Sequence, residues 1–403
     1  MLVPLVAMPI HQPLANLLAQ GWTMTVAALL APFVVARFLS GRDGGWLTIG
    51  ACANMLLLLV ATPAVQFDWL VTQPYALSVS LGFGGLIVAD KPGGPGGIVA
   101  ALVLMLLACW VNIGIVVMLA IAAAVAGRRP VRLLALETAA AAIASLAARF
   151  LASAHTVTSL APLRQWADAW RQLLAGTPAM TVSPAAAIGI VAGAAAAIAW
   201  LWKTGGLPPR RTLAAILAMA FGTWLVVGTS LWVGMNRYSF RYMYPTVMLV
   251  GVGVSTVFAA LFANRWKGPS SVAALAALAA VAVVRYGTPS PDRITRGFDD
   301  RFGRQTAAVL HSGATVIGGD YWRVWPAVFH ANLALARAHA AAQVFGLAYR
   351  SEETDPLWKS AGRQVLIASW PDDRSVGAVA GEHGIVVTPL AHLPEIDLYT
   401  GQP

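Results

Sequence analysis

Long apolar stretches dominate the first 286 residues, and charged residues, glycines or prolines separate one stretch from the next. Each stretch has about 15 to 25 residues, and a helix needs roughly 20 apolar residues to cross the hydrocarbon core of a bilayer. The pattern therefore predicts about ten membrane spans. We place them at residues 14–38, 46–65, 69–89, 97–111, 113–127, 132–152, 184–202, 212–234, 242–263 and 270–286.

The stretch from Gly97 to Gly127 is long enough for one extended helix, but Asn112 and Gly114 interrupt it. We expect a hairpin of two short helices, because a hairpin places Lys91 and the basic loop 128–132 on the same side of the membrane. Glu137 lies inside the sixth predicted span, and we expect it to pair with an arginine of that loop.

From about residue 287 the pattern becomes that of a water-soluble domain. Pro289, Pro291 and the charged run to Arg304 predict a linker that leads into a helix. Short β-rich runs at 314–317, 344–347, 364–369 and 385–388 alternate with helical patterns at 324–341 and 375–383. This alternation predicts a small α/β domain, residues 287–403, with partly parallel strands. It would follow an α-helical polytopic membrane bundle, residues 1–286.

Composition supports this division. The chain is 58% hydrophobic and 11% charged, whereas soluble domains carry roughly a quarter charged residues. Up to Arg285 there are 17 basic and five acidic residues, against ten and 12 beyond it. The excess positive charge lies in loops between helices, which argues against a nucleic-acid-binding face. Cys52 and Cys109 lie in apolar segments without metal-ligand spacing, so we expect no structural metal site and no disulfide framework.

Basic residues also predict the orientation. One set of alternate loops holds eleven lysines and arginines and the opposite set holds six, so the first set is assigned to the cytoplasm. The α/β domain then lies on the extracytoplasmic side of the cytoplasmic membrane, which is the periplasm in a bacterium with two membranes. Residues 1–13 also fall outside, and we therefore expect a further helix upstream in the natural protein.

Polar and aromatic residues collect in three extracytoplasmic segments, and the first is His11-Gln12-Pro13-Leu14. The second, LAPLRQWADAWRQLL from Leu160, places Arg164, Asp168 and Arg171 opposite an apolar face. That arrangement predicts an amphipathic helix in the membrane interface. This helix either contacts substrate or only caps the bundle, and the sequence leaves both readings open.

The third extracytoplasmic segment, residues 236–242, is a short turn between two spans and contains Arg237, Arg241 and Tyr242. Guanidinium groups bind phosphate through paired hydrogen bonds, so these residues are candidate ligands for the phosphate of a membrane lipid. The alternative is that the arginines extend toward water within an ordinary aromatic belt.

Two further acidic positions are candidates. Asp68, in Gln66-Phe67-Asp68-Trp69, lies close to the membrane, where a carboxylate is either functional or an N-cap of the following helix. Gly318-Gly319-Asp320-Tyr321-Trp322 follows the first predicted strand, at the strand end where open α/β sheets bind ligands. The segment lacks the glycine spacing and the lysine of nucleotide-binding loops, so Asp320, Tyr321 and Trp322 are candidates for contact with another substrate.

Several of these fragments resemble the multi-pass (C-type) glycosyltransferases, which take sugars from polyprenyl-phosphate carriers. His11-Gln12-Pro13-Leu14 is similar to the His-Pro-Pro-Leu segment of that family, and the short helices ending at Gly127-Arg128-Arg129 resemble its middle hairpin and basic loop. Arg241-Tyr242 followed by Pro245 resembles the Arg-Tyr-x-x-Pro start of a late helix, and Asp320-Tyr321-Trp322 resembles a motif in the soluble tails of some bacterial members.

The resemblance implies an inverting hexosyl- or pentosyltransferase with an extracytoplasmic site, in which an acid of the first outer loop acts as a base or binds a divalent cation. In the family that acid precedes the His-Pro-Pro-Leu segment, but here no acidic residue precedes His11. Either the natural chain has an acidic loop upstream, or Asp68 substitutes for it. The alternatives are a non-catalytic membrane partner of the same fold and a small-molecule transporter.

Overall fold

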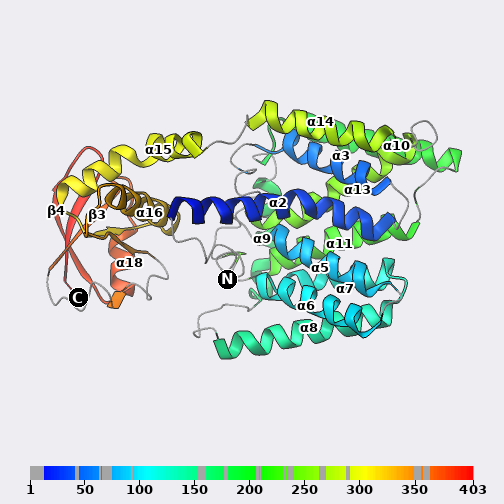
Figure 1. Ribbon diagram of the computed structural model, residues 1–403, viewed down its shortest axis with the longest axis horizontal. Coiled ribbons are helices and arrows are strands. Elements are labelled where there is room, and N and C mark those ends of the chain that lie inside the picture. The colour runs from blue at the N-terminus through cyan, green and yellow to red at the C-terminus, as the bar shows by residue number, and fades with distance from the viewer. Residues whose placement is uncertain are drawn as a thin grey trace. The chain divides into compact units, whose positions relative to one another are not determined.

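The chain forms two compact units, Met1–Gly287 and Thr288–Pro403, in the computed structural model (Figure 1). Each unit is described by itself. The structure describes residues 13–40, 45–62, 65, 75–91, 94–151, 160–176, 180–205, 208, 210–230, 233–234, 240–262, 269–286, 291–348, 355–356 and 364–402.

The first unit is a bundle of helices, and each of the ten predicted spans contains one of them. Its long elements are α2 (Pro13–Ser40), α3 (Gly45–Val60), α5 (Tyr75–Ala89), α6 (Pro95–Val111), α7 (Ile115–Ala126), α8 (Pro130–Leu151), α10 (Pro184–Thr204), α11 (Arg210–Thr229), α13 (Tyr244–Phe262) and α14 (Pro269–Tyr286). Two further elements, the amphipathic helix α9 (Leu163–Gly176) and the 3-10 helix η3 (Phe240–Met243), lie between them in the chain.

Five helices of the described chain are long and apolar enough to cross a membrane, namely α2, α8, α10, α11 and α13. The remaining apolar helices are shorter. At about 1.5 Å per residue, the 12 residues of α7 extend only about 18 Å, which is less than the ~30 Å of a hydrocarbon core. The coarse prediction of a helical membrane-type bundle is confirmed, and five of the ten predicted spans contain a helix of membrane-crossing length.

The predicted break at Asn112 is confirmed. Helix α6 ends at Val111, and the Asn112 side-chain oxygen accepts the backbone N–H of Gly114 at 3.0 Å. At the other end of the hairpin, the Asp90 carboxylate accepts the backbone N–H of Arg128 at 2.9 Å. The segments that follow α5 and α7 therefore meet at one end of the bundle, as the hairpin requires.

The expected ion pair of Glu137 is absent among the residues that the structure describes. Glu137 is buried, and its Oε1 has no hydrogen-bond partner there. The nearest arginine in sequence is Arg132, which lies in the first turn of the same helix, five residues earlier. Side chains meet along a helix at spacings of three and four residues rather than five, so the helical geometry does not bring this pair together.

Large apolar side chains are exposed on the surface of the bundle. Trp22, Val26 and Leu30 follow one another at four-residue spacing on α2, and Leu217 and Phe221 do the same on α11. Residues spaced in this way share one face of a helix. An apolar surface of this extent is unfavourable in water and suits the hydrocarbon of a bilayer, which indicates a membrane protein.

The second unit is a five-stranded mixed sheet in the order β2-β1-β3-β5-β4. Its strands are β1 (Val316–Gly318), β2 (Phe345–Leu347), β3 (Val365–Ser369), β4 (Val386–His392) and β5 (Asp397–Gln402). Strand β1 pairs in parallel with β2 and with β3, whereas β5 is antiparallel to β3 and β4. The predicted partly parallel sheet is confirmed, but β5 was not predicted.

Helices cover both faces of this sheet. Ile317 of β1 packs with residues of α15 (Pro291–Ser312) and α16 (Tyr321–Arg337), whereas Val316 packs with α18 (Val376–Glu382) on the opposite face. Alternate strand residues point to opposite faces, so the three-residue strand serves both cores.

The predicted linker before Arg304 is wrong, because Pro291–Ser312 is one continuous helix, α15. Proline is well placed at the start of a helix, where its missing N–H costs nothing. Tertiary contacts then hold α15: the buried His330 ring of α16 hydrogen-bonds Thr306 at 2.7 Å and Asp299 at 2.9 Å.

Gly228 on α11 provides a test of how α9 packs against α11. A Cβ at Gly228 would overlap the indole ring of Trp170 of α9, whereas a Cβ at Gly189 of α10 would meet nothing within 4 Å. We expect Gly228→Val to displace α9 and to cost about 1–3 kcal/mol. Gly189→Val should leave the unfolding temperature in detergent nearly unchanged. Equal unfolding temperatures for the two variants would contradict this seating.

Candidate functional site

Backbone hydrogen bonds gather several connecting segments at one end of the bundle. The N–H of Thr62, after α3, donates to the Met180 carbonyl at 2.9 Å, and the N–H of Val182 donates to Val60 at 2.8 Å. The N–H of Ala161, before α9, donates to Thr229 at the end of α11 at 2.8 Å. We call this region, defined by residues 60–62, 160–176, 180–182, 228–230 and 240–243, the aromatic end.

Helix α9 lies against α11 through aromatic contacts. The Trp170 ring stacks on Trp224 with centroids 5.4 Å apart, and the Trp166 Nε1–H donates to the Ala161 carbonyl at 2.7 Å. Leu173 is buried, but Leu163 and Leu174 remain exposed. The helix therefore closes the end of the bundle with part of its apolar side and leaves the rest accessible to a membrane interface.

The predicted polar residues of α9 lie at the surface. Arg164 is exposed, and Asp168 forms an exposed ion pair with Arg171 at 2.9 Å. Exposed pairs of this kind contribute only about 0–1 kcal/mol to stability, so the pair does not explain the fold. These side chains are available for contact with a lipid headgroup or a substrate.

Tyr242 fixes the turn η3 against the start of α5. Its ring is buried and lies 5.8 Å from the ring of Tyr75. Arg241 precedes it within η3, so the backbone of this predicted phosphate ligand is part of the aromatic end. The predicted site residues His11, Asp68 and Arg237 lie outside the described residues.

A second candidate region lies in the C-terminal unit, where β1 and β3 end. After β1 the chain passes through α16 to β2, which pairs with one edge of β1. The next strand, β3, pairs with the opposite edge of β1. Such a reversal of strand order opens a crevice at the carboxyl ends of the strands, which is the usual ligand position in open α/β sheets. Gly319-Asp320 and the loop 370–375 line this switch point.

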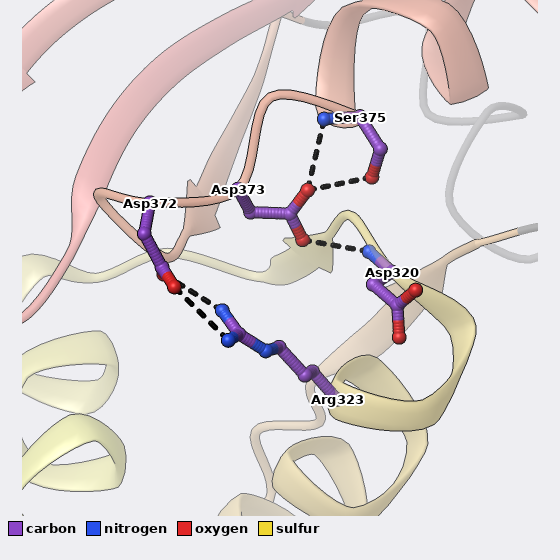
Figure 2. Close-up of polar contacts among 5 residues, drawn as sticks. All are labelled: Asp320, Arg323, Asp372, Asp373 and Ser375. Atoms are coloured by element: carbon purple, nitrogen blue, oxygen red, sulfur yellow. Dashed lines mark hydrogen bonds and ion pairs between the residues drawn. The ribbon is translucent and has the colours of Figure 1, made fainter. Parts of the chain in front are cut away.

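Figure 2 shows how the two loops are joined. Asp373 accepts the backbone N–H of Asp320 at 2.7 Å and both the N–H and the hydroxyl of Ser375, at 2.9 and 2.6 Å. Arg323, in the first turn of α16, donates to both oxygens of Asp372 at 2.7 and 2.9 Å. Gly319 is required here because its φ is +136° and a Cβ would overlap the Asp373 carboxylate.

Electrostatics follows from these contacts. The hydrogen bonds from Arg323 hold the pKa of Asp372 below its ordinary value, and the same bonds raise the pKa of Arg323. A carboxylate held in this way is a weaker base, so Asp372 is poorly suited to take a proton from a substrate. Across the described ranges, no group of three or more His, Cys, Asp or Glu side chains could hold a metal ion.

The predicted tail residues meet this switch point in different ways. The Asp320 carbonyl accepts the N–H groups of Arg323 and Val324, so Asp320 begins α16, and its exposed carboxylate points away from Asp373 (Figure 2). Tyr321 is half-buried and its ring lies 6.3 Å from Trp325. Trp322 contributes its backbone to α16.

Sequence reasoning missed Arg323, Asp372 and Asp373 as members of this region. Asp372 and Asp373 follow a predicted strand closely, and the carboxyl ends of parallel strands meet at one edge of a sheet. That signal could have identified the two aspartates. Nothing local in the sequence identifies Tyr75, Trp170 and Trp224, because their contacts join helices that are distant along the chain.

Comparisons with protein-family models, with characterised proteins and with solved structures found no match for this chain.

The Arg323–Asp372 contact predicts a pH dependence. Because the pKa of Asp372 is lowered in the folded state, its contribution to stability is present above the unfolded pKa and is lost as pH falls through the folded pKa, below about pH 4. We expect Asp372→Asn to accelerate hydrogen exchange of the loop 370–375 at pH 6, and we expect the difference from the unchanged protein to shrink as pH falls below about 4. If the variant and the unchanged protein exchange at the same rate at every pH, the Arg323–Asp372 pair does not hold the loop.

Proposed function

We propose that the chain is a cytoplasmic-membrane glycosyltransferase of about ten spans that acts on a polyprenyl-phosphate-linked sugar at the extracytoplasmic face. In this proposal the five shorter apolar helices also cross the membrane, with the bilayer thinning locally to match them. The aromatic end faces outward and the C-terminal unit lies in the extracytoplasmic space. The resemblance of the sequence fragments to the multi-pass glycosyltransferases supports the proposal.

The observation that carries the proposal is the position of η3. Tyr242 is anchored on Tyr75, which holds the backbone of Arg241 at the end of the bundle where α9 also lies. Transfer of a sugar from a lipid phosphate leaves negative charge on the departing phosphate, and positive groups fixed nearby stabilise that charge. We assign this role to Arg241 and Arg237, with Tyr242 as the anchor.

The remaining candidates receive supporting roles. Asp68 is the proposed base that takes a proton from the acceptor hydroxyl, with or without a divalent cation. His11, Arg164 and Asp168 are proposed to contact the lipid-linked donor at the aromatic end. Asp320, Tyr321 and Trp322 are proposed to contact a substrate at the switch point of the C-terminal unit.

One observation favours a second candidate function, a non-catalytic membrane partner of the same fold. The carboxylates of Asp372 and Asp373 are each engaged by a donor within the chain. Groups held in this way position a structure rather than carry out proton transfer. In that case the chain binds the lipid or another subunit without catalysing transfer.

Arg241→Ala separates these functions. As a transferase, the variant should lose at least about 100-fold in the rate of lipid-linked glycan formation, because a donor to the developing charge is removed. The control is Arg285→Ala, which removes the same charge from the last turn of α14 and should retain the rate. Both rates are measured by extracting lipid-linked glycans from host cells in which the chain is replaced by each variant.

Retention of product by Arg241→Ala, when deletion of the whole chain abolishes it, would support the partner function instead. Retention of product after deletion of the whole chain would contradict both functions.

A further inference from the structure

Helix α9 covers one end of a stripe on α11 that is otherwise exposed. Leu217, Phe221, Trp224 and Gly228 recur at spacings of four, three and four residues, so they lie on one side of α11. Leu217 and Phe221 have 70% and 58% of their surface exposed. Further along the stripe, Trp224 is half-buried, and Gly228 is buried against the indole ring of Trp170 of α9. The exposed apolar surface of α11 therefore continues into α9.

Ring contacts join the two helices along this stripe. The centroid of the Phe221 ring lies 5.9 Å from that of Trp224, which in turn lies 5.4 Å from that of Trp170. Trp166, one turn before Trp170, adds a further ring at 6.1 Å. The row of aromatic rings runs from a surface that suits hydrocarbon to the body of α9. Helix α9 therefore lies on the same side of α11 as that surface.

The apolar face of α9 is wider than the part that the bundle covers. Leu173 is buried and Trp170 is half-buried against the bundle. Leu163, Ala167 and Leu174 are exposed, and at about 100° of rotation per residue they fall within roughly 40° of one another, next to Trp170. We call these three residues the open flank. Leu163 and Leu174 leave 75% and 60% of their surface exposed, so the open flank is an apolar surface without a cover in this chain's described part.

Two arginines border the open flank. Arg164 and Arg171 are seven residues apart, so they lie on one side of α9, two turns from each other, and both are exposed. This line lies roughly 60–80° from the centre of the open flank, on the side away from Trp170. Gln165 and Gln172 lie farther round the helix and are exposed. The order around α9 is therefore bundle contact, apolar flank, arginines and uncharged polar side chains.

This order matches the layers at the surface of a bilayer. Hydrocarbon gives way to phosphate groups and then to water, and amphipathic helices lie at that boundary with their apolar side in the acyl chains and basic residues at the headgroups. Guanidinium groups bind phosphate through paired hydrogen bonds. A second protein could also cover an apolar flank, but the adjoining stripe of α11 already suits hydrocarbon, and the two arginines supply the charge that phospholipid phosphates require.

We propose that the open flank of α9 inserts among the acyl chains of the bilayer and that Arg164 and Arg171 bind the phosphate groups of anionic phospholipids. Helix α9 then lies in the membrane interface beside α11. The same acyl chains contact the open flank and the exposed stripe of Leu217 and Phe221. The seat on α11 fixes the depth of the helix, and the arginines enrich anionic lipid next to it.

This inference goes beyond sugar transfer and can hold or fail separately from it. In synthetic phospholipid the chain has no lipid-linked donor, so contact measured there is contact with phospholipid. The phosphate of a lipid-linked donor would lie at the same level of the membrane, so Arg164 can serve in both contacts.

The first test measures the surroundings of a nitrobenzoxadiazole label on α9. The full chain, with Cys52→Ala and Cys109→Ala so that no native thiol reacts, is reconstituted in liposomes of dioleoylphosphatidylcholine and dioleoylphosphatidylglycerol. The label is attached at Leu163→Cys or Leu174→Cys in the open flank, or at Gln172→Cys on the polar side as a control. The label emits strongly away from water, and a nitroxide on a lipid acyl chain quenches it on contact. We expect strong, quenchable emission at both leucine positions and weak emission at the control.

The second test compares nitroxides carried by two lipids at equal concentration. Phosphatidylglycerol should quench the label at Leu174→Cys more than phosphatidylcholine does. Arg164→Gln combined with Arg171→Gln should reduce this excess at least about twofold, because each basic residue near the surface attracts anionic lipid. Gln165→Ala, an exposed polar position on the same helix, should leave it unchanged.

Three outcomes would overturn the proposal. Weak emission from both leucine positions would place the open flank in water. Strong emission that no nitroxide lipid quenches would show that protein covers the flank, as a second copy of the chain would. Equal quenching by the two lipids when both arginines are present would exclude the arginines as ligands of anionic phospholipid. If Leu163→Cys does not fold, judged by its unfolding temperature, Leu174→Cys provides the same comparison.

Discussion

Close contact between small residues and the side chains of neighbouring helices is the interaction on which the bundle depends. In a bilayer, helices gain no hydrophobic free energy by leaving lipid for one another, so packing and interhelical hydrogen bonds must hold them together. A Cβ at Gly82 of α5 would lie 2.9 Å from Leu119 of α7, and a Cβ at Gly85 would lie 2.8 Å from Met105 of α6. Glycine permits these approaches without displacing the Leu119 and Met105 side chains, and they bring α5 against two neighbours at once.

Hydrogen bonds from side chains to carbonyl groups reinforce the same helix. Ser78 donates to the Ala108 carbonyl of α6 at 3.0 Å, and Ser80 donates to the Ala27 carbonyl of α2 at 2.9 Å. Each such bond contributes on average about 0.6 kcal/mol within a membrane. Because α5 is held by several neighbouring helices, it also fixes the positions of the segments that contact its two ends. The Tyr75 contact with η3 is at one end, and the Asp90 contact with the segment before α8 is at the other.

The C-terminal unit shows a different constraint, which is the closure of its switch point. Two carboxylates of the loop after β3 accept hydrogen bonds from the start of α16. Asp373 accepts the backbone N–H of Asp320, and Asp372 accepts the guanidinium of Arg323. A helix N-terminus favours negative charge, so these aspartates occupy the position that an anionic ligand takes in many α/β folds. The exposed Asp320 carboxylate therefore lies beside a helix start whose donors are already paired with Asp372 and Asp373.

The sequence by itself determined the helix positions, the break at Asn112 and the α/β character of the tail, because apolar length and local periodicity act within one segment. It did not predict β5, since Asp397–Gln402 is mostly polar and becomes a strand by pairing with β3 and β4. It misassigned the start of α15, which is held by contacts to His330. Only the tertiary structure placed Tyr75 against Tyr242, packed Trp170 over Gly228 and joined Asp373 to Asp320. The physical reason is that these relations join residues far apart in the chain, and their energies depend on how whole helices and strands pack.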